Sequence, residues 1–119
     1  MPLFYPEELD SVAHSHHFEQ SFSFADYPGP VSIGLIPVGS NILKTFIEVI
    51  SVFDAGVQVT VGDSVAMARL MAVGDSRLTR AVTYEADSGY TYTSDTAVNL
   101  YFVGVVPTMG TGRVVVYYL

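Results

Sequence analysis

The sequence predicts an all-β protein, an antiparallel β-sandwich of jelly-roll type with about eight short strands. Three observations lead to this fold class. A chain of 119 residues is the size of one domain. Short runs of β-branched and aromatic residues alternate with Gly, Asp and Ser turns. No segment is long enough for the several helices that a parallel sheet needs as crossovers. One short helical segment and an extended N-terminal arm complete the prediction.

The first thirty residues differ from the rest of the chain. They contain four of the six prolines and all three histidines, and prolines at both ends interrupt regular structure. Between them Phe18, Phe22 and Phe24 alternate, which predicts a short strand at residues 18–24. We therefore divide the chain into an arm with a short strand (1–30) and a sandwich domain (31–119).

The sandwich domain shows strand patterns throughout, separated by turn residues. The predicted strands cover residues 31–37, 42–53, 57–61, 78–85, 90–93, 96–103 and 112–119. The last two are joined by a Pro/Gly turn, and we expect them to form a hairpin at the centre of the sandwich. The longest strand, 42–53, mixes apolar and polar side chains on both faces, which indicates a position between a core and a partly covered exterior.

One segment breaks the β pattern. Asp63 suits a helix N-cap, good helix formers follow it, and Gly74 suits the position after a helix end. We expect one or two helical turns over residues 64–72. The residues that this helix would bury are apolar: Val65, Met67 or Ala68, and Met71.

Composition restricts the possible functions. The chain has no Cys, so neither disulfides nor thiolate chemistry are available. A net charge of −7 argues against nucleic-acid binding. The N-terminus lacks the features of a signal peptide, and no apolar stretch is long enough to span a membrane. Only 14% of the residues are charged. Either other protein subunits cover part of the surface, or Tyr, Ser and Thr fill the outer faces.

Side chains suited to catalysis or metal binding are sparse. His14, His16 and His17 form one cluster that could bind Zn²⁺ with Glu19 or Asp10. An extended arm has no fixed groups around these histidines to hold them in place as metal ligands. A solvated or interface patch is therefore the preferred interpretation of the cluster. The serines lack a nucleophile-elbow sequence, and most acidic residues lie in turns that they cap. The sequence predicts no enzymatic activity, no cofactor and no metal site.

Aromatic side chains are the candidates for protein contact. Six of them lie in the predicted arm: Phe4, Tyr5, Phe18, Phe22, Phe24 and Tyr27. Each ring would contribute about 1.5–3 kcal/mol if it were buried across a subunit boundary. The alternative is that the arm folds back onto its own sandwich. The tyrosines of the C-terminal half fit plain strand packing, an interface or a sugar-binding face.

Residues 42–119 contain an ordered series of motifs. In chain order they are FIEVISVFDAG, VGDS, ARLMAVGDSRLTRAVTY, SGYTYTSDTAVNLYF and GRVVVYYL. The most distinctive pair is DTAVNLYF with GRVVVYYL. This series resembles small structural proteins of tailed bacteriophages. The resemblance implies an all-β virion component of the capsid decoration (cement) type, with no catalytic residues to carry over.

The same resemblance implies the partners and the location. The partners would be the major capsid protein and copies of the chain itself, as a dimer or trimer, with neither nucleic acid nor membrane. The protein would be made in the host cytoplasm and would lie on the capsid surface of the virion. Two alternatives stay open: a tail or head–tail junction component, and a carbohydrate-binding receptor module that uses the Tyr-rich face.

Overall fold

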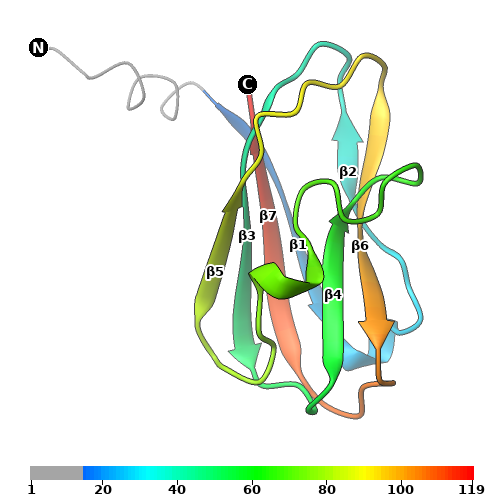
Figure 1. Ribbon diagram of the computed structural model, residues 1–119, viewed down its shortest axis with the longest axis vertical. Helices are drawn as coiled ribbons and strands as arrows, with labels where there is room; N and C mark the ends of the chain where they lie inside the picture. Colours follow the sequence, from blue (N-terminus) through cyan, green and yellow to red (C-terminus); the bar gives the residue numbers. More distant parts are fainter. Residues whose placement is uncertain (1–14) are drawn as a thin grey trace, which may run out of the picture.

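Strands are the main regular elements of the computed structural model, which describes residues 15–119 (Figure 1). The strands are β1 (His16–Ser23), β2 (Val31–Ile36), β3 (Ile42–Ser51), β4 (Val57–Gly62), β5 (Thr83–Asp87), β6 (Thr96–Gly104) and β7 (Thr111–Tyr118). Two short 3-10 helices, η1 (Phe24–Asp26) and η2 (Val73–Asp75), are the helical elements of this part of the chain. No helix in the described residues has the length and apolarity to cross a bilayer.

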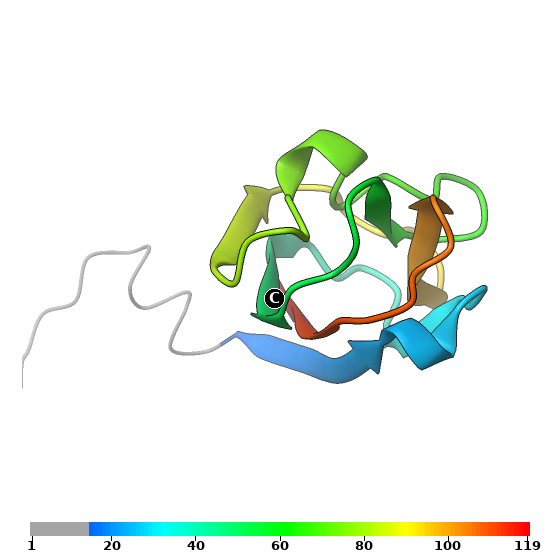
Figure 2. The ribbon, with the colours of Figure 1, turned by 90° about the horizontal axis from the view of Figure 1, so that it is seen from below.

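The strands form two antiparallel sheets that face each other across one core (Figure 2). The four-stranded sheet has the order β1-β7-β3-β5, and the three-stranded sheet has the order β2-β6-β4. Successive strands from β1 to β7 alternate between the two sheets, as in a jelly roll. A full jelly roll has an eighth strand beside β4, and here the bridge between Val61 and Met71 lies in that place.

The predicted antiparallel sandwich is therefore confirmed. The described residues form seven strands where about eight were expected, because residues 90–93 contribute only the isolated bridge between Asn41 and Thr91. The core lies between the sheets because alternate strand residues point inward. In β3 these are Thr45, Ile47 and Val49. The other strands add mainly Val, Ile and Leu: Ile33, Ile36, Val57, Val59, Val61, Val98, Leu100, Val114 and Val116.

Two glycines leave room for aromatic rings of the core. A Cβ atom on Gly34 would lie 2.5 Å from the ring of Phe18. A Cβ on Gly110 would lie 2.3 Å from the ring of Phe53, and the φ of Gly110 is +122°, which other residues rarely adopt. Phe53 is 1% exposed and stacks on Phe22 with ring centroids 5.7 Å apart. A side chain at either glycine would displace the ring it meets.

The expected hairpin of the last two strands is wrong. β6 is the central strand of the three-stranded sheet, and β7 lies between β1 and β3 in the other sheet. Both strands are central, as expected, but they face each other across the core instead of pairing. The connection at residues 105–110 is long enough to cross the ~10 Å between packed sheets, so the chain changes sheet there.

The expected helix at residues 64–72 is also wrong, since these residues form turns and bends. Asp63 does accept hydrogen bonds from the backbone N–H of Val65 and Ala66, as an N-cap would. The backbone N–H groups of Leu70 and Met71 instead donate to the carbonyl of Val61 at 2.9 and 3.1 Å, which holds the end of the segment against β4. Tertiary hydrogen bonds therefore override helix propensity.

The burial expected for that helix differs too. Val65 is 87% exposed and Met67 is 55% exposed, whereas Met71 is buried as predicted. Gly74 lies inside η2 and does not follow a helix end.

The strand predicted at residues 18–24 forms as β1. It pairs with β7 along its whole length, from His16 opposite Tyr118 to Ser23 opposite Thr111. Residues 16–23 are therefore an outer strand of the four-stranded sheet. The rest of the predicted arm before Ser15 lies outside the described residues.

Candidate interaction surface

More than half of the exposed large hydrophobic side chains in residues 15–119 lie at one end of the sandwich, the lower end in Figure 1. We call this surface the apolar end. It is formed by η1, the end of β3, the end of β6 and the β6–β7 connection. Its exposed members are Phe24, Tyr27, Ile50, Val52, Val103, Val105, Val106 and Met109. Apolar side chains gathered on one surface mark protein contact sites.

Hydrogen bonds fix the loops that carry the apolar end. The backbone N–H of Phe24 donates to the carbonyl of Gly110 at 3.1 Å, and that of Val105 donates to Gly56 at 3.1 Å. The carboxylate of Asp54 accepts from the hydroxyl of Thr108 at 2.9 Å. The β1–β2, β3–β4 and β6–β7 connections are thus tied to one another, so the surface needs little ordering when a partner binds.

The acidic groups at this end are already bonded within the chain. The carboxylate of Asp26 accepts from the backbone N–H of Ser23 at 2.8 Å, and the Ser23 hydroxyl accepts from Ala25 at 3.2 Å. Asp54 is held by Thr108. Neither carboxylate needs a partner from outside, and the rest of this surface is dominated by aliphatic and aromatic groups.

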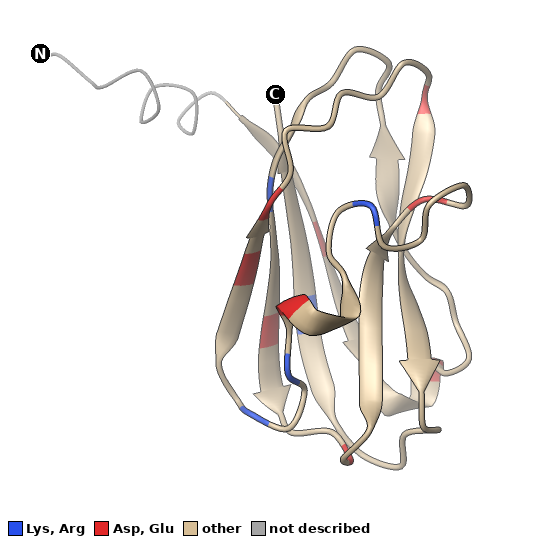
Figure 3. Ribbon diagram, in the orientation of Figure 1, with Lys and Arg blue, Asp and Glu red and all other residues tan. Residues whose placement is uncertain are grey.

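Charge is divided unequally between the two sheets (Figure 3). The strands of the three-stranded sheet carry no charged residue. The outer face of the four-stranded sheet carries two groups of ion pairs. Arg113 lies 2.9 Å from Glu19 and 3.0 Å from Glu48, and Lys44 lies 3.0 Å from Asp87. Because interface cores are depleted in charge, the charged face is the side that suits solvent.

Hydrogen bonding to these carboxylates raises the pKa of both cations. For Arg113 the main cause is Glu19, and for Lys44 it is Asp87. The side chains are partly exposed, so the pairs add little to stability. They do keep one face of the sandwich hydrated.

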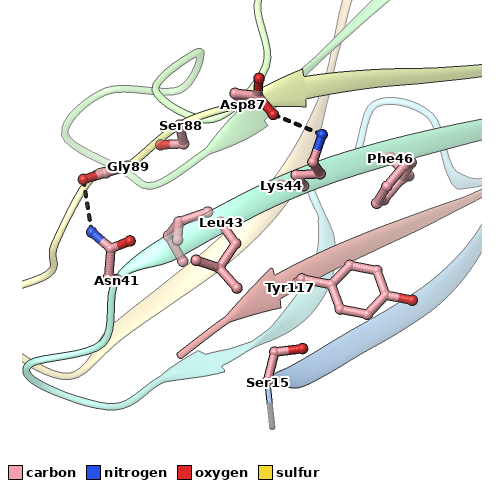
Figure 4. Close-up of a pocket in the computed structure, with 10 residues that line it drawn as sticks. Ser15, Asn41, Leu43, Lys44, Phe46, Asp87, Ser88, Gly89 and Tyr117 are labelled. Atoms are coloured by element: carbon pink, nitrogen blue, oxygen red, sulfur yellow. Dashed lines mark hydrogen bonds and ion pairs between the residues drawn. The ribbon is translucent and has the colours of Figure 1, made fainter. Parts of the chain in front are cut away.

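A groove of about 680 Å³ lies on the outer face of the four-stranded sheet, at the end opposite the apolar end (Figure 4). Leu43, Phe46 and Tyr117 form much of its apolar lining. Its polar neighbours are already engaged, since Lys44 pairs with Asp87 and the amide of Asn41 donates to the carbonyl of Gly89 at 2.8 Å. The groove therefore suits an apolar side chain better than a sugar, whose hydroxyl groups need free hydrogen-bonding partners.

A buried carboxylate, Asp63, organises the loop that follows β4. Asp63 is 2% exposed and accepts from Nε of Arg69 at 2.7 Å and from the hydroxyl of Tyr92 at 2.8 Å. Arg69 also lies over the ring of Tyr90, 4.2 Å from its centroid. The group joins the 63–72 segment to the β5–β6 connection, which lies far from it in sequence. It opens on no groove that the structure describes, and its role is structural.

The environment of Asp63 lowers its pKa. Burial alone would raise it, but the hydrogen bonds from Arg69, the backbone N–H of Ala66, Tyr92 and Val65 outweigh burial and hold the pKa at about 2. Burial and the bond to Asp63 raise the pKa of Tyr92. Both groups therefore keep their charge state across the neutral range.

We expect stability to fall in acid because of Asp63. Its folded pKa of about 2 lies below the usual 3.8, so its contribution is complete above the unfolded pKa and is lost as pH falls from about 4 to 2. The loss should be about 2 kcal/mol. Urea unfolding of wild type and Asp63→Asn at pH 2–6 measures this loss. The other carboxylates titrate in both proteins, so the difference between the two curves is due to Asp63. Parallel curves for the two proteins would contradict this assignment.

The histidines make ring contacts. His16 lies 5.5 Å from Tyr118 and His17 lies 5.3 Å from Tyr117, between ring centroids. Within residues 15–119 no three metal-capable side chains come together, and His14 of the predicted cluster lies outside the described residues.

The six predicted interface residues fall into three groups. Phe4 and Tyr5 lie outside the described residues. Phe22 is in the core, 2% exposed, and Phe18 is half-buried and stacks on Tyr118 at 5.5 Å. These two rings pack on their own sandwich, which is the alternative that the sequence left open. Phe24 and Tyr27, 41% and 36% exposed, lie at the apolar end.

The sequence also held a signal for the rest of the apolar end. Val105, Val106 and Met109 lie between two strands, where turn residues are usually polar. Ile50 and Val52 gave no such signal, because they continue the alternation of a strand.

Two solved structures contain chains of the same fold. One is a chain in the acidic-stable capsid structure of Helicobacter pylori bacteriophage KHP30, with a TM-score of 0.69 and 20% identity over 87% of this chain and 86% of that chain. The other is a chain in the capsid asymmetric unit of cyanophage Pam1, with a TM-score of 0.65 and 19% identity over 88% and 84%. No family model and no curated protein matches the sequence. At these identities the likeness establishes the fold.

Proposed function

We propose that the protein is a non-catalytic structural component of a bacteriophage capsid, of the decoration (cement) type. The observation that carries this proposal is the likeness, over nearly the whole chain, to chains in two phage capsid structures. The motif resemblance of residues 42–119 agrees with it. In this role the protein binds the shell of the major capsid protein, stabilises it and remains on the virion surface.

The surface of the sandwich supports the same role. A decoration protein needs one side that binds the shell and another that faces water. The apolar end offers exposed Phe24, Val106 and Met109 on loops held by hydrogen bonds, and the charged face of the four-stranded sheet offers ion pairs that water tolerates. We assign the apolar end to the shell.

Binding to particles that lack the protein tests the proposal. Such particles come from deleting its gene in the phage that carries it. Added protein should bind them until its copy number is comparable with that of the major capsid protein, and it should raise the temperature at which they open. A protein that leaves these particles unbound would contradict the proposal.

A tail or head–tail junction component is the second candidate, because a β-sandwich with an apolar end also fits a ring of subunits. Copy number in purified virions separates the two roles. A junction component would be present in a single ring, far below the copy number of the shell protein.

A further inference from the structure

A second groove, of about 760 Å³, opens at the edge of the sandwich between the start of β4 and the segment that leads from η2 to β5. Its lining comes from the β3–β4 turn, the first residues of β4, residues 73–80, and Tyr84 of β5. Strand β4 begins at Val57, and the start of this strand is at the lower end of Figure 1, so this groove adjoins the apolar end.

Two arginines without a carboxylate partner line this groove. Arg77 and Arg80 are exposed and make no ion pair within residues 15–119. The other three basic side chains, Lys44, Arg69 and Arg113, each lie within 3.0 Å of a carboxylate oxygen. In a chain of net charge −7, two free guanidinium groups in one groove form a local site for carboxylates.

Of two further side chains in the groove, Asp75 and Tyr84, only Tyr84 can donate a hydrogen bond to a carboxylate. The carboxylate of Asp75 lines the groove, but it accepts from the backbone N–H of Ala72 at 2.8 Å. The hydroxyl of Tyr84 is buried and has no hydrogen-bond partner within the described residues. A buried hydroxyl without a partner is costly, and an incoming carboxylate would accept a hydrogen bond from it.

We propose that this groove binds residues 7–10 of a second copy of the chain. Their sequence is Glu-Glu-Leu-Asp, and residues 1–14 contain no Lys or Arg. The carboxylates of Glu7, Glu8 and Asp10 pair with Arg77 and Arg80, a contact that suits the two-pronged guanidinium group. The inference concerns contact between copies, and it does not depend on the shell being the partner.

Reach favours a second copy over the same chain. Strand β1 begins at the upper end of Figure 1. The side of the groove with Arg77 and Arg80 lies at the other end, beside the end of β3, because the backbone N–H of Phe53 donates to Leu78 and that of Val49 donates to Val82. Strand β3, with ten residues, spans roughly 33 Å between these ends. An extended chain covers at most ~3.6 Å per residue, so Asp10 reaches about 18 Å from Ser15 and Glu7 about 29 Å. Any path around the edge of the sheet is longer than the straight distance.

The contact joins unlike surfaces, the N-terminal segment of one copy and the groove of the next. Such a head-to-tail contact closes into a ring if the rotation between copies allows it. The geometry thus fits cyclic oligomers, among which a trimer is one.

Charge reversal of the full-length protein tests the proposal. Sedimentation equilibrium should show that wild type self-associates. Arg77→Glu with Arg80→Glu, or Glu7→Lys with Glu8→Lys and Asp10→Lys, should each weaken association at least tenfold. Mixing these two variants should restore association, because the groove of each variant is then opposite in charge to the N-terminal segment of the other. Glu85→Lys with Asp87→Lys, on the charged face, is the control for altered net charge and should associate as wild type does.

Cysteine cross-linking gives a second measurement, since the chain has no Cys. Glu8→Cys protein mixed with Thr79→Cys protein should form a disulfide-linked heterodimer under mild oxidation. A chain carrying both substitutions should form intermolecular links.

Each of the following results would overturn the inference: a wild type that stays monomeric, reversal variants that associate like wild type, or a disulfide that closes within one chain. Reversal at Arg77 and Arg80 that impairs only particle binding would assign the groove to another protein's acidic segment, and would also overturn it. Particle binding by the same variants is measured separately, so failure of this inference and failure of the capsid role are distinguishable.

Discussion

Replacing Asp63 by alanine should lower the free energy of unfolding by about 3 kcal/mol, because removing one partner of a buried ion pair leaves the other uncompensated. In this fold the loss would leave Arg69, the hydroxyl of Tyr92 and the N–H groups of Val65 and Ala66 without their acceptor. The thermal midpoint should fall by roughly 10 °C. Differential scanning calorimetry and urea unfolding at pH 7 measure both quantities.

Tyr92→Phe is the matched control for that result. It removes one hydrogen bond to Asp63 but keeps the ring, which is 3% exposed and lies 4.8 Å from Tyr90 between centroids. We expect a loss of about 1 kcal/mol. If Asp63→Ala cost no more than Tyr92→Phe, the carboxylate would not hold the 63–72 segment in place.

Asp63 also shows what local sequence patterns can predict and what they cannot. The sequence identified it as a residue that satisfies the backbone N–H groups that follow it, and it does so. A helix does not follow, because Tyr92, 29 positions along the chain, and the carbonyl of Val61 hold the segment by contacts that no local propensity contains. The chemistry of the residue was predictable, and the element was not.

The same limit applies to the strands. Alternation of apolar residues predicted most of the strands, although the strand expected at residues 78–85 forms only at Thr83–Asp87. In the longest strand both faces are mixed, so the sequence period alone did not identify the buried face. The partner of each strand depends on the path of the connections. The short link at residues 105–110 suits a hairpin as well as a crossing between sheets, and the crossing occurs because β7 pairs with β1 and β3.

The apolar end follows from topology in a similar way. Phe24 and Tyr27 were predicted as contact residues, and Val106 and Met109 are visible in the sequence as apolar residues between strands. That these residues share one end of the molecule follows only from the jelly-roll connections, which bring the β1–β2 and β6–β7 links together. A residue-by-residue reading could not assemble that surface.

Adding charge to the apolar end should abolish binding to the particle. In the double variant Val106→Asp with Met109→Asp, two carboxylates replace side chains that are 56% and 48% exposed. In the free protein they stay hydrated and the fold is kept, with a thermal midpoint within a few degrees of wild type. Against the shell they would be buried without partners, at a cost of several kcal/mol. Affinity for particles that lack the protein should fall at least 100-fold, measured by co-sedimentation.

The chain offers a control of the same residue types and charge. Val65 and Met67 are 87% and 55% exposed and lie on the loop after β4, toward the opposite end (Figure 1). Val65→Asp with Met67→Asp should bind particles as wild type does, because these side chains face water in the proposed arrangement. If this variant lost binding and the Val106/Met109 variant kept it, the shell would contact the upper end, and the assignment of the apolar end would be wrong. Equal losses would point to net charge, since both variants add the same two carboxylates to an already acidic chain.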